Sequence, residues 1–247
     1  MNDYFYDLHI HSCLSPCGDD DMTPNNIANM GSLLGLGVMA LTDHNSCKNL
    51  PPFFSACKRN GIVPVGGMEL TTAEEIHIVC LFEGLEEAIA FGDEVYRHIP
   101  PIKNRPDIFG NQLITDNEDN VTAEEEKLLI SATDLDLYTA TRLVKKFGGA
   151  AYPAHVDRES NGIIAILGDI PPEPGFKVCE FNDKANILPY KDKYTSLKEL
   201  FTLSCSDAHH LWDISEAENR LAIDDEPYSS ARVRQSLIRM LKGEVKK

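Results

Sequence analysis

Histidines and carboxylates of this chain gather where predicted strands end. His9 and His11 form a His-x-His pair in the first predicted strand, and Asp207 and His209 form an Asp-x-His pair after a later one. Because side chains alternate between the two faces of a strand, residues two positions apart point the same way. Four further candidates lie in or just beyond other predicted strands: His44, Glu69, His77 and His155. Six of the eight histidines therefore belong to one ordered pattern.

This combination of side chains is typical of a metal centre. Imidazole binds Zn, Fe and Mn, and carboxylates can bridge two ions. Packed together without cations, so many donors would leave buried polar groups without partners. The set exceeds what one tetrahedral ion takes, so it predicts two or three divalent ions (Zn, Mn or Fe). Centres of this kind commonly activate water and neutralise phosphoryl oxygens. His98 and His210 fall outside the pattern, and we expect no metal there.

Composition limits the partners of such a centre. The 247 residues are 43% hydrophobic and 25% charged, as in an ordinary globular protein, and the formal net charge is −16. An acidic chain binds long nucleic acids and anionic membranes poorly. There is no apolar run of about 18 residues and no secretory signal, so we expect no membrane association.

The cysteines favour a reducing compartment. The seven cysteines form no disulfide-scaffold pattern and no Cys-x-x-Cys pair, which predicts a cytoplasmic protein. Cys13 and Cys17 lie close to the predicted centre. They could bind zinc, but packing of the loop is the favoured interpretation.

Short apolar strands alternate with amphipathic helices along the chain. Strands are predicted at 4–10, 38–42, 62–69, 76–82, 150–153, 178–181 and 201–206, with a last short one at 220–223. Helices are predicted near 25–36, 53–60, 85–98, 135–147, 196–200 and 230–241. Thr23 with Pro24 is a plausible start of the first helix, and Thr133 with Asp136 fits a capping box at the fourth.

The alternation predicts a parallel α/β fold made of a single barrel-like domain over residues 1–247. In such a barrel the carboxyl ends of the strands converge on one mouth, where active sites are built. Residues 99–124 interrupt the rhythm with prolines, glycine and asparagines, which predicts an insertion or a long surface loop. The insertion could shape the mouth or a subunit contact.

Five motifs, in order, resemble those of the PHP (polymerase and histidinol phosphatase) superfamily. They are Asp7-Leu8-His9-Ile10-His11-Ser12, Thr42-Asp43-His44, Glu69 with His77, Ala154-His155, and Ser206-Asp207-Ala208-His209. The resemblance covers residues 7–209. It implies a distorted (β/α)7 TIM-like barrel with a trinuclear metal site that hydrolyses phosphoesters.

The same resemblance implies how the ligands are divided. One ion would be held by His9, His11, Glu69 and Asp207. Glu69 would bridge to a second ion, held also by His77 and His155, and His44 and His209 would hold a third. The third ion needs one more ligand from the loop after His11. We expect Asp19, which follows a Cys-Gly pair as in the histidinol phosphatase group, with Asp20 as second choice and a solvated acidic turn as the alternative.

Arg158 is the expected substrate-binding residue. The segment Ala154-His155-Val156-Asp157-Arg158 resembles an Ala-His-Pro-x-Arg segment whose arginine contacts the substrate phosphate. An arginine fork suits bidentate phosphate binding, although an ordinary surface arginine is the alternative. Asp207 or His209 could move a proton to the leaving alcohol. Asp7 and Asp43, beside ligands on the same strands, are read as orienting groups or strand-end caps.

The sequence therefore predicts a metal-dependent phosphoric ester hydrolase. Its substrate would be a small phosphorylated molecule, a phosphomonoester first and a cyclic or nucleotide phosphodiester second, hydrolysed by metal-activated hydroxide. The alternatives are a 5′–3′ exonuclease on short oligonucleotides, an amidohydrolase-type metal hydrolase and a non-catalytic binding module. Neither the natural substrate nor the oligomeric state follows from the sequence.

Overall fold

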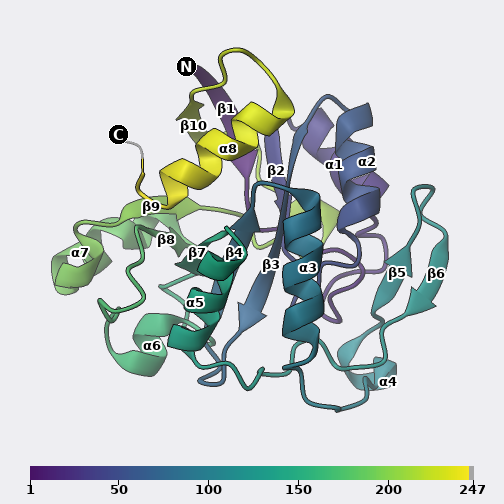
Figure 1. The fold of residues 1–247 in the computed structure, drawn as a ribbon, viewed down its shortest axis with the longest axis horizontal. Coiled ribbons are helices and arrows are strands. Elements are labelled where there is room, and N and C mark those ends of the chain that lie inside the picture. The colour runs from purple at the N-terminus through teal and green to yellow at the C-terminus, as the bar shows by residue number, and fades with distance from the viewer. Residues whose placement is uncertain (245–247) are drawn as a thin grey trace.

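A curled sheet forms the frame of the molecule. In the computed structural model, which describes residues 1–244, six strands lie in the order β10-β1-β2-β3-β4-β7 (Figure 1). They are β1 (Asn2–Asp7), β2 (Val38–Leu41), β3 (Val63–Thr71), β4 (His77–Phe82), β7 (Ala150–Pro153) and β10 (Arg220–Ile223). Residues 245–247 of the predicted domain lie outside the described residues.

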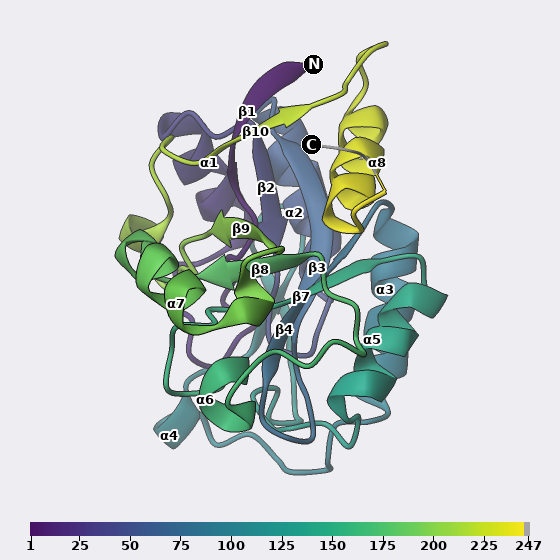
Figure 2. The same cartoon turned by 90° about the vertical axis from the view of Figure 1, so that its left-hand side faces the viewer.

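Two further strands continue the curve. Strands β8 (Val178–Phe181) and β9 (Phe201–Ser204) form a parallel pair, which lies next to β7 in Figure 2. The Val156 amide after β7 donates to the Glu180 carbonyl of β8 at 2.8 Å. Beyond β9, Ala208 pairs in parallel with Ile10 beyond β1, which brings the last strand back to the first. The distorted TIM-like barrel is confirmed.

The sheet is mixed, so the prediction of a parallel sheet is wrong in part. The pairs β1–β2, β2–β3 and β8–β9 are parallel, whereas β3–β4, β4–β7 and β1–β10 are antiparallel. Residues 72–76 between β3 and β4 are too few for a crossover, which takes a dozen or more. Because β4 runs backwards, its first residue, His77, lies at the edge where β3 ends.

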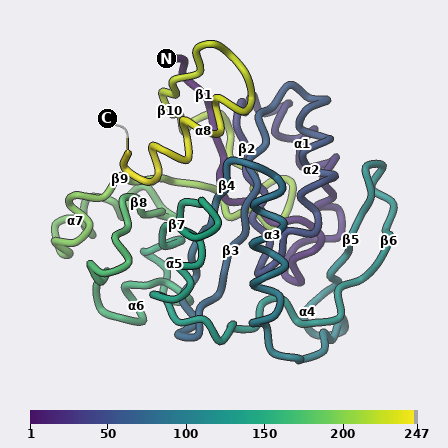
Figure 3. Tube along the Cα trace, in the orientation of Figure 1, coloured from purple at the N-terminus to yellow at the C-terminus, as the bar shows by residue number. Residues whose placement is uncertain are grey.

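The outer face of this sheet is covered by α1 (Pro24–Leu33), α2 (Leu50–Arg59), α3 (Leu85–Tyr96) and α5 (Leu137–Lys146) (Figure 1). Helix α8 (Ser230–Leu241) packs against the opposite face. Val38 and Ala40 of β2 pack in a cluster that includes Val233 of α8, while Met39 packs in the cluster that holds the other helices. Helix α8 crosses the end of the sheet where β1 begins, close to both termini (Figure 3).

The start of α1 is confirmed, whereas the capping box of α5 is wrong. The Thr23 side chain accepts a hydrogen bond from the Asn26 amide, with Pro24 first in the helix. At α5 the cap is Asp136, whose carboxylate accepts from the Thr139 amide at 2.7 Å. The Thr133 hydroxyl is used elsewhere, since it donates to the carbonyl of Thr71 in β3 at 2.8 Å.

Residues 99–124, predicted as an insertion or a long surface loop, contain regular elements. They hold α4 (Pro106–Phe109) and the antiparallel hairpin of β5 (Leu113–Thr115) and β6 (Val121–Glu124). The Leu113 amide donates to the Cys13 carbonyl at 2.8 Å, so the hairpin supports the loop that follows His11.

Short helices fill the segment before β9. The predicted helix at 196–200 is instead a 3-10 turn, η2 (Thr195–Leu197), preceded by η1 (Lys184–Asn186) and α7 (Ile187–Lys193). Helix α7 went unpredicted because Pro189 interrupts its pattern, yet proline is tolerated in a first turn. The remaining elements are α6 (Ile163–Leu167) and η3 (Leu211–Asp213). Within residues 1–244, no helix has the length and apolar character needed to cross a membrane.

Candidate metal centre

The eight motif residues converge at one end of the barrel. Most of them follow the ends of β1, β2, β7 and β9, whereas Glu69 lies late in β3 and His77 begins β4. The full set is His9, His11, His44, Glu69, His77, His155, Asp207 and His209. All of them are buried except His77 and His209, which are partly exposed. The reversed direction of β4 is what brings His77 to this end.

Glu69 lies at the middle of the centre. Its two carboxylate oxygens contact five imidazoles at 2.9–3.3 Å: those of His9, His11, His44, His77 and His155. Burial raises the pKa of Glu69, but the charges of His77, His9 and His44 outweigh it and hold the pKa well below its usual range. An ionised carboxylate that faces several imidazoles is suited to bridge cations.

Three overlapping clusters have donor atoms within 4.8 Å of one another. The first contains His9, His11, Glu69 and Asp207, the same four residues that the family resemblance groups around one ion. The second contains His44, Glu69 and His77, and the third contains His11, His44 and His209. His155 was expected with the second; it is not in that cluster, although its Nε2 lies 3.1 Å from Glu69 Oε1.

Unpartnered buried atoms show that the centre fits cations. His44 Nδ1 and His155 Nδ1 are buried and make no hydrogen bond, although His44 Nδ1 lies 3.1 Å from Glu69. His9 Nε2 and His11 Nε2 are 3.2 Å apart, so they cannot both carry a proton. Each unsatisfied buried polar group costs about 1–3 kcal/mol. Divalent ions beside Glu69 would satisfy the donors that face it, such as His44 Nδ1.

In two of the histidines, a hydrogen bond to one ring nitrogen determines which nitrogen can bind a metal. The Ser15 hydroxyl donates to Asp43 at 2.8 Å, so it can only accept from His11 Nδ1–H, 2.9 Å away. His209 Nδ1–H donates to the Asp207 carbonyl at 2.7 Å. Both rings are therefore left with Nε2 free for a metal.

The protonation states differ across the centre. Burial lowers the pKa of His11, but hydrogen bonds to Asp207 and Glu69 outweigh it and raise the pKa to about 9. Burial and the nearby His11 lower the pKa of His209 to about 4, and the same causes lower that of His44. Burial raises the pKa of Asp207, but His9 and His11 bring it well below its usual range. His44 and His209 are thus neutral near pH 7 and ready to ligate, whereas a metal must displace the extra proton of His11.

Backbone strain occurs at two of the candidate ligands. His155 has φ 26° and Asp207 has φ 51°, in the left-handed region that non-glycine residues rarely adopt. Such strain costs on the order of 1–3 kcal/mol each and clusters at functional sites. Asp7, fully buried, holds the strained segment, because its carboxylate accepts from the amides of Ser206 at 3.1 Å and Ser215 at 3.0 Å.

The loop after His11 does not bring an acidic side chain into the clusters. Gly18 makes the turn possible, since a Cβ there would lie 2.5 Å from the Ser12 carbonyl. Asp19 lies beside His210 instead, 3.5 Å from its Nδ1, and Asp20 accepts from Asn111 at 2.8 Å. Neither belongs to any cluster found in residues 1–244.

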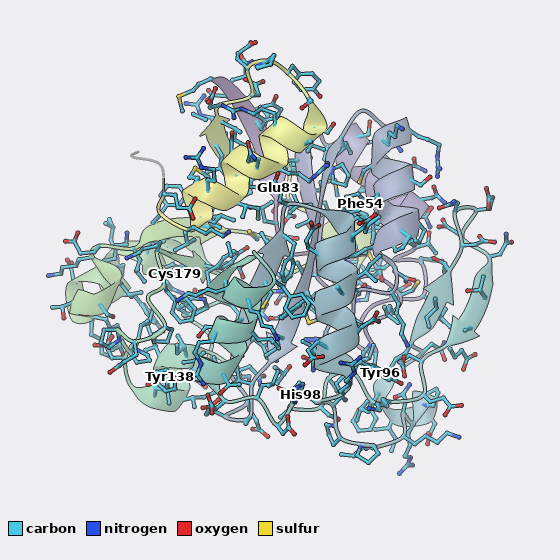
Figure 4. All side chains as sticks on the ribbon, viewed as in Figure 1. Phe54, Glu83, Tyr96, His98, Tyr138 and Cys179 are labelled. Atoms are coloured by element: carbon cyan, nitrogen blue, oxygen red, sulfur yellow. The ribbon has the colours of Figure 1, made fainter. Side chains whose placement is uncertain are left out.

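Arg158 lies at the rim. Its guanidinium is 38% exposed, with Nη1 at 2.5 Å from Asp207 and Nη2 donating to Asn182 at 2.8 Å. His98 lies beyond the end of α3 (Figure 4) and pairs with Asp134. His210 stacks on Trp212, and neither of these two histidines belongs to a donor cluster found in residues 1–244.

Glu180 of β8 was not predicted as a residue of the centre, but it contacts a candidate ligand. This carboxylate is 1% exposed, and its Oε1 accepts from His9 Nδ1–H at 2.9 Å. The one available signal is a charged residue in the middle of a short apolar strand, Val178-Cys179-Glu180-Phe181.

Comparisons with known proteins agree with this geometry. A family model described as PHP domain matches residues 7–201. Among curated proteins, no sequence matches the chain. Similar solved structures include the lesion-specific endonuclease PfuEndoQ from Pyrococcus furiosus, with a TM-score of 0.64 and 16% identity. That match covers 98% of this chain and 56% of the endonuclease, so the chain spans just over half of that protein.

Two other similar structures are closer to this chain in length. A candidate metal-dependent phosphoesterase from Bifidobacterium adolescentis has a TM-score of 0.60 at 17% identity, over 95% of this chain and 96% of its own. An amidohydrolase from Chromobacterium violaceum, with bound sulfate and no metal, has a TM-score of 0.54 at 18% identity. That match covers 89% of this chain and 92% of the amidohydrolase. These similarities concern the fold.

Proposed function

Since the chain belongs to the PHP domain family, we propose that it is a metal-dependent phosphoric ester hydrolase acting on small phosphorylated molecules. The observation that supports this most directly is the arrangement of Glu69 among five imidazoles, with buried donor atoms left unpartnered around it. Such a donor set fits two or three divalent ions of the Zn, Mn or Fe type.

The ligands are proposed from the clusters and from the family motifs. His9, His11, Glu69 and Asp207 would hold one ion, Glu69 with His77 and His155 a second, and His44 with His209 a third. Asp19 remains a proposed ligand of the third ion only if its loop moves toward His209, because its carboxylate faces His210 in the structure. When bound, the ions supply Lewis acidity that polarises a phosphoryl oxygen and makes water acidic enough to react near neutral pH.

Arg158 would orient the phosphate. Its Nη1 lies 2.5 Å from Asp207 Oδ2 and its side chain is partly exposed, so it can turn a pair of N–H groups toward an incoming ester. A planar fork matches two phosphate oxygens and stays charged at any working pH. The fixed charge also stabilises the negative charge that grows in the transition state.

Proton delivery to the leaving alcohol is assigned to His209 or Asp207. His209 is the most exposed imidazole of the centre, with 25% of its side chain accessible. Its Nδ1–H is held by the Asp207 carbonyl, so only Nε2 can exchange a proton with a substrate. Metal binding at the same nitrogen would compete with this role, which leaves Asp207 as the other candidate.

Net charge favours a small substrate over a long nucleic acid. A chain with a formal charge of −16 repels an extended polyanion, while bound cations and Arg158 would make the mouth locally positive. Two alternatives remain, a 5′–3′ exonuclease on short oligonucleotides and an amidohydrolase-type metal hydrolase. A lesion-specific endonuclease and an amidohydrolase are among the proteins with a similar fold, so we keep a nuclease and an amidohydrolase activity in the test.

One preparation can test the proposal against both alternatives. Metal content is measured by elemental analysis, and turnover is measured with added Mn²⁺ or Zn²⁺ on phosphomonoesters, phosphodiesters, short oligonucleotides, amides and lactones. We expect at least two ions per chain and hydrolysis of a small phosphate ester. Fewer than two ions, with no turnover of any phosphate ester, would refute the proposal. Turnover confined to oligonucleotides or to amides and lactones would favour the respective alternative.

A further inference from the structure

Glu180 is a buried carboxylate, and within residues 1–244 its only ion-pair partner is His9, an imidazole of the metal centre. It lies in the third position of β8, 1% exposed, on a strand that carries none of the family motifs. We propose that Glu180 is a positioning residue, which holds His9 with Nε2 toward the metal and ties His9 to His155. This inference rests on the proposed metal centre but not on its substrate.

The contact with His9 sets the ring's tautomer. A carboxylate can only accept, so the 2.9 Å contact with Glu180 Oε1 places a proton on His9 Nδ1. The opposite nitrogen, Nε2, then faces Glu69 and Asp207, each at 3.3 Å. A carboxylate behind a ligating histidine fixes the ring and makes it a stronger donor.

The contact with His155 joins a second strand to the first. Glu180 Oε1 also accepts from the His155 amide at 3.3 Å, while the Glu180 carbonyl accepts from the Val156 amide at 2.8 Å. His155 has the left-handed backbone described above, with φ 26°. Glu180 therefore holds both the side chain of His9 and the strained backbone of His155.

A purely structural role explains this carboxylate poorly. Within residues 1–244 no lysine or arginine ion pair to Glu180 is found, and its Oε2 is buried without a hydrogen bond. Isolated burial of a charge is expensive, and an apolar side chain of similar volume would pack at least as well. The buried negative charge of Glu180 is balanced if His9 binds a metal ion and carries part of its positive charge.

Glu180→Gln tests the proposal because it keeps the shape and one acceptor oxygen but removes the charge. Glu125→Gln is the matched control, since Glu125 is also buried and its partners, Lys48 and Tyr96, lie outside the centre. Zinc affinity is measured by chelator competition on metal-free protein, and the ligand field is read from the absorption spectrum of the Co²⁺ form. We expect Glu180→Gln to weaken metal binding about 10- to 100-fold and to change the Co²⁺ spectrum, with the control unchanged.

A double-mutant cycle shows whether Glu180 acts through His9. If it does, Glu180→Gln adds little further loss of zinc affinity in a His9→Ala background. An equal loss in both backgrounds, or wild-type affinity and spectrum in Glu180→Gln, would overturn the inference. Glu180→Asp, which keeps the charge on a shorter side chain, is measured in the same way if Glu180→Gln does not fold.

Hydrolysis of p-nitrophenyl phosphate is followed in the same series to keep the two proposals separate. If wild-type protein binds zinc but hydrolyses no phosphate ester, while Glu180→Gln binds zinc more weakly, the proposed function fails and the positioning role stands. If wild-type protein hydrolyses the ester and Glu180→Gln binds zinc normally, the positioning role fails and the function stands.

Discussion

The protonation of His11 makes the stability of the metal-free protein depend on pH in an unusual direction. The pKa of His11 is about 9 in the fold, because hydrogen bonds to Asp207 and Glu69 overcome the effect of burial, against 6.5 for an unperturbed histidine. A folded-state pKa above the unfolded value stabilises the fold fully below pH 6.5. That contribution is lost as pH rises toward 9. Metal-free protein should therefore become less stable between pH 6.5 and 8.5.

The expected size follows from the two pKa values. Linkage gives a loss of about 2 kcal/mol in the free energy of unfolding between pH 6.5 and 8.5, since one pKa unit is worth about 1.4 kcal/mol. For a domain of this length that corresponds to a fall of about 4–8 °C in Tm. The pKa of His9 is also raised, because Glu180, Asp207 and Glu69 overcome its burial, but its Nε2 lies 3.2 Å from His11 Nε2, so the two rings share one extra proton and the loss is counted once. The pKa values of His44 and His209 are lowered, so these residues change the free energy of unfolding below pH 6.5, outside this window.

Thermal unfolding of chelator-treated protein at the two pH values measures the effect. The His11→Asn variant should lose much of the slope, whereas His98→Asn, which removes a histidine outside the centre, should keep it. Protein loaded with Zn²⁺ should not lose stability over the same range, because its ligating histidines have already given up the extra proton. Metal-free protein that is equally stable or more stable at pH 8.5, or a slope that survives His11→Asn unchanged, would refute the reasoning.

Three further outcomes follow from the centre and its rim. Arg158→Ala should lower kcat/KM for a phosphate ester by about 100-fold, with metal content unchanged and partial recovery in Arg158→Lys; an unaltered kcat/KM would make it an ordinary surface arginine. Glu69→Gln should reduce the number of bound ions, measured by elemental analysis, and lower turnover by more than about 100-fold; a full complement of ions would exclude the bridging role. Chelation should abolish hydrolysis and Mn²⁺ or Zn²⁺ should restore it, so activity that persists without metal would contradict the proposed function.

Much of the frame could be predicted because the signals are local. A continuous apolar run predicted β2, and Thr23 with Pro24 predicted the start of α1. The direction of β4 was harder, since periodicity gives a strand but not its orientation. The short link of residues 72–76 did hold the answer, because so few residues cannot make a parallel crossover. Helix α7 was missed because Pro189 hides its pattern.

The sequence by itself determined the chemical character of the centre. His9 with His11 and Asp207 with His209 share faces through the two-residue period of a strand, and the ordered motifs supply the other donors. Only the tertiary structure decided how these donors are held. Glu180 contacts His9 although 171 residues separate them in the sequence. The Ser15 hydroxyl donates to Asp43 and accepts from His11 Nδ1–H, which orients the His11 ring. The tertiary structure also places Asp19 beside His210 and outside the donor clusters. Such contacts depend on which strands and loops become neighbours, and that is set by packing of the whole chain rather than by any local pattern.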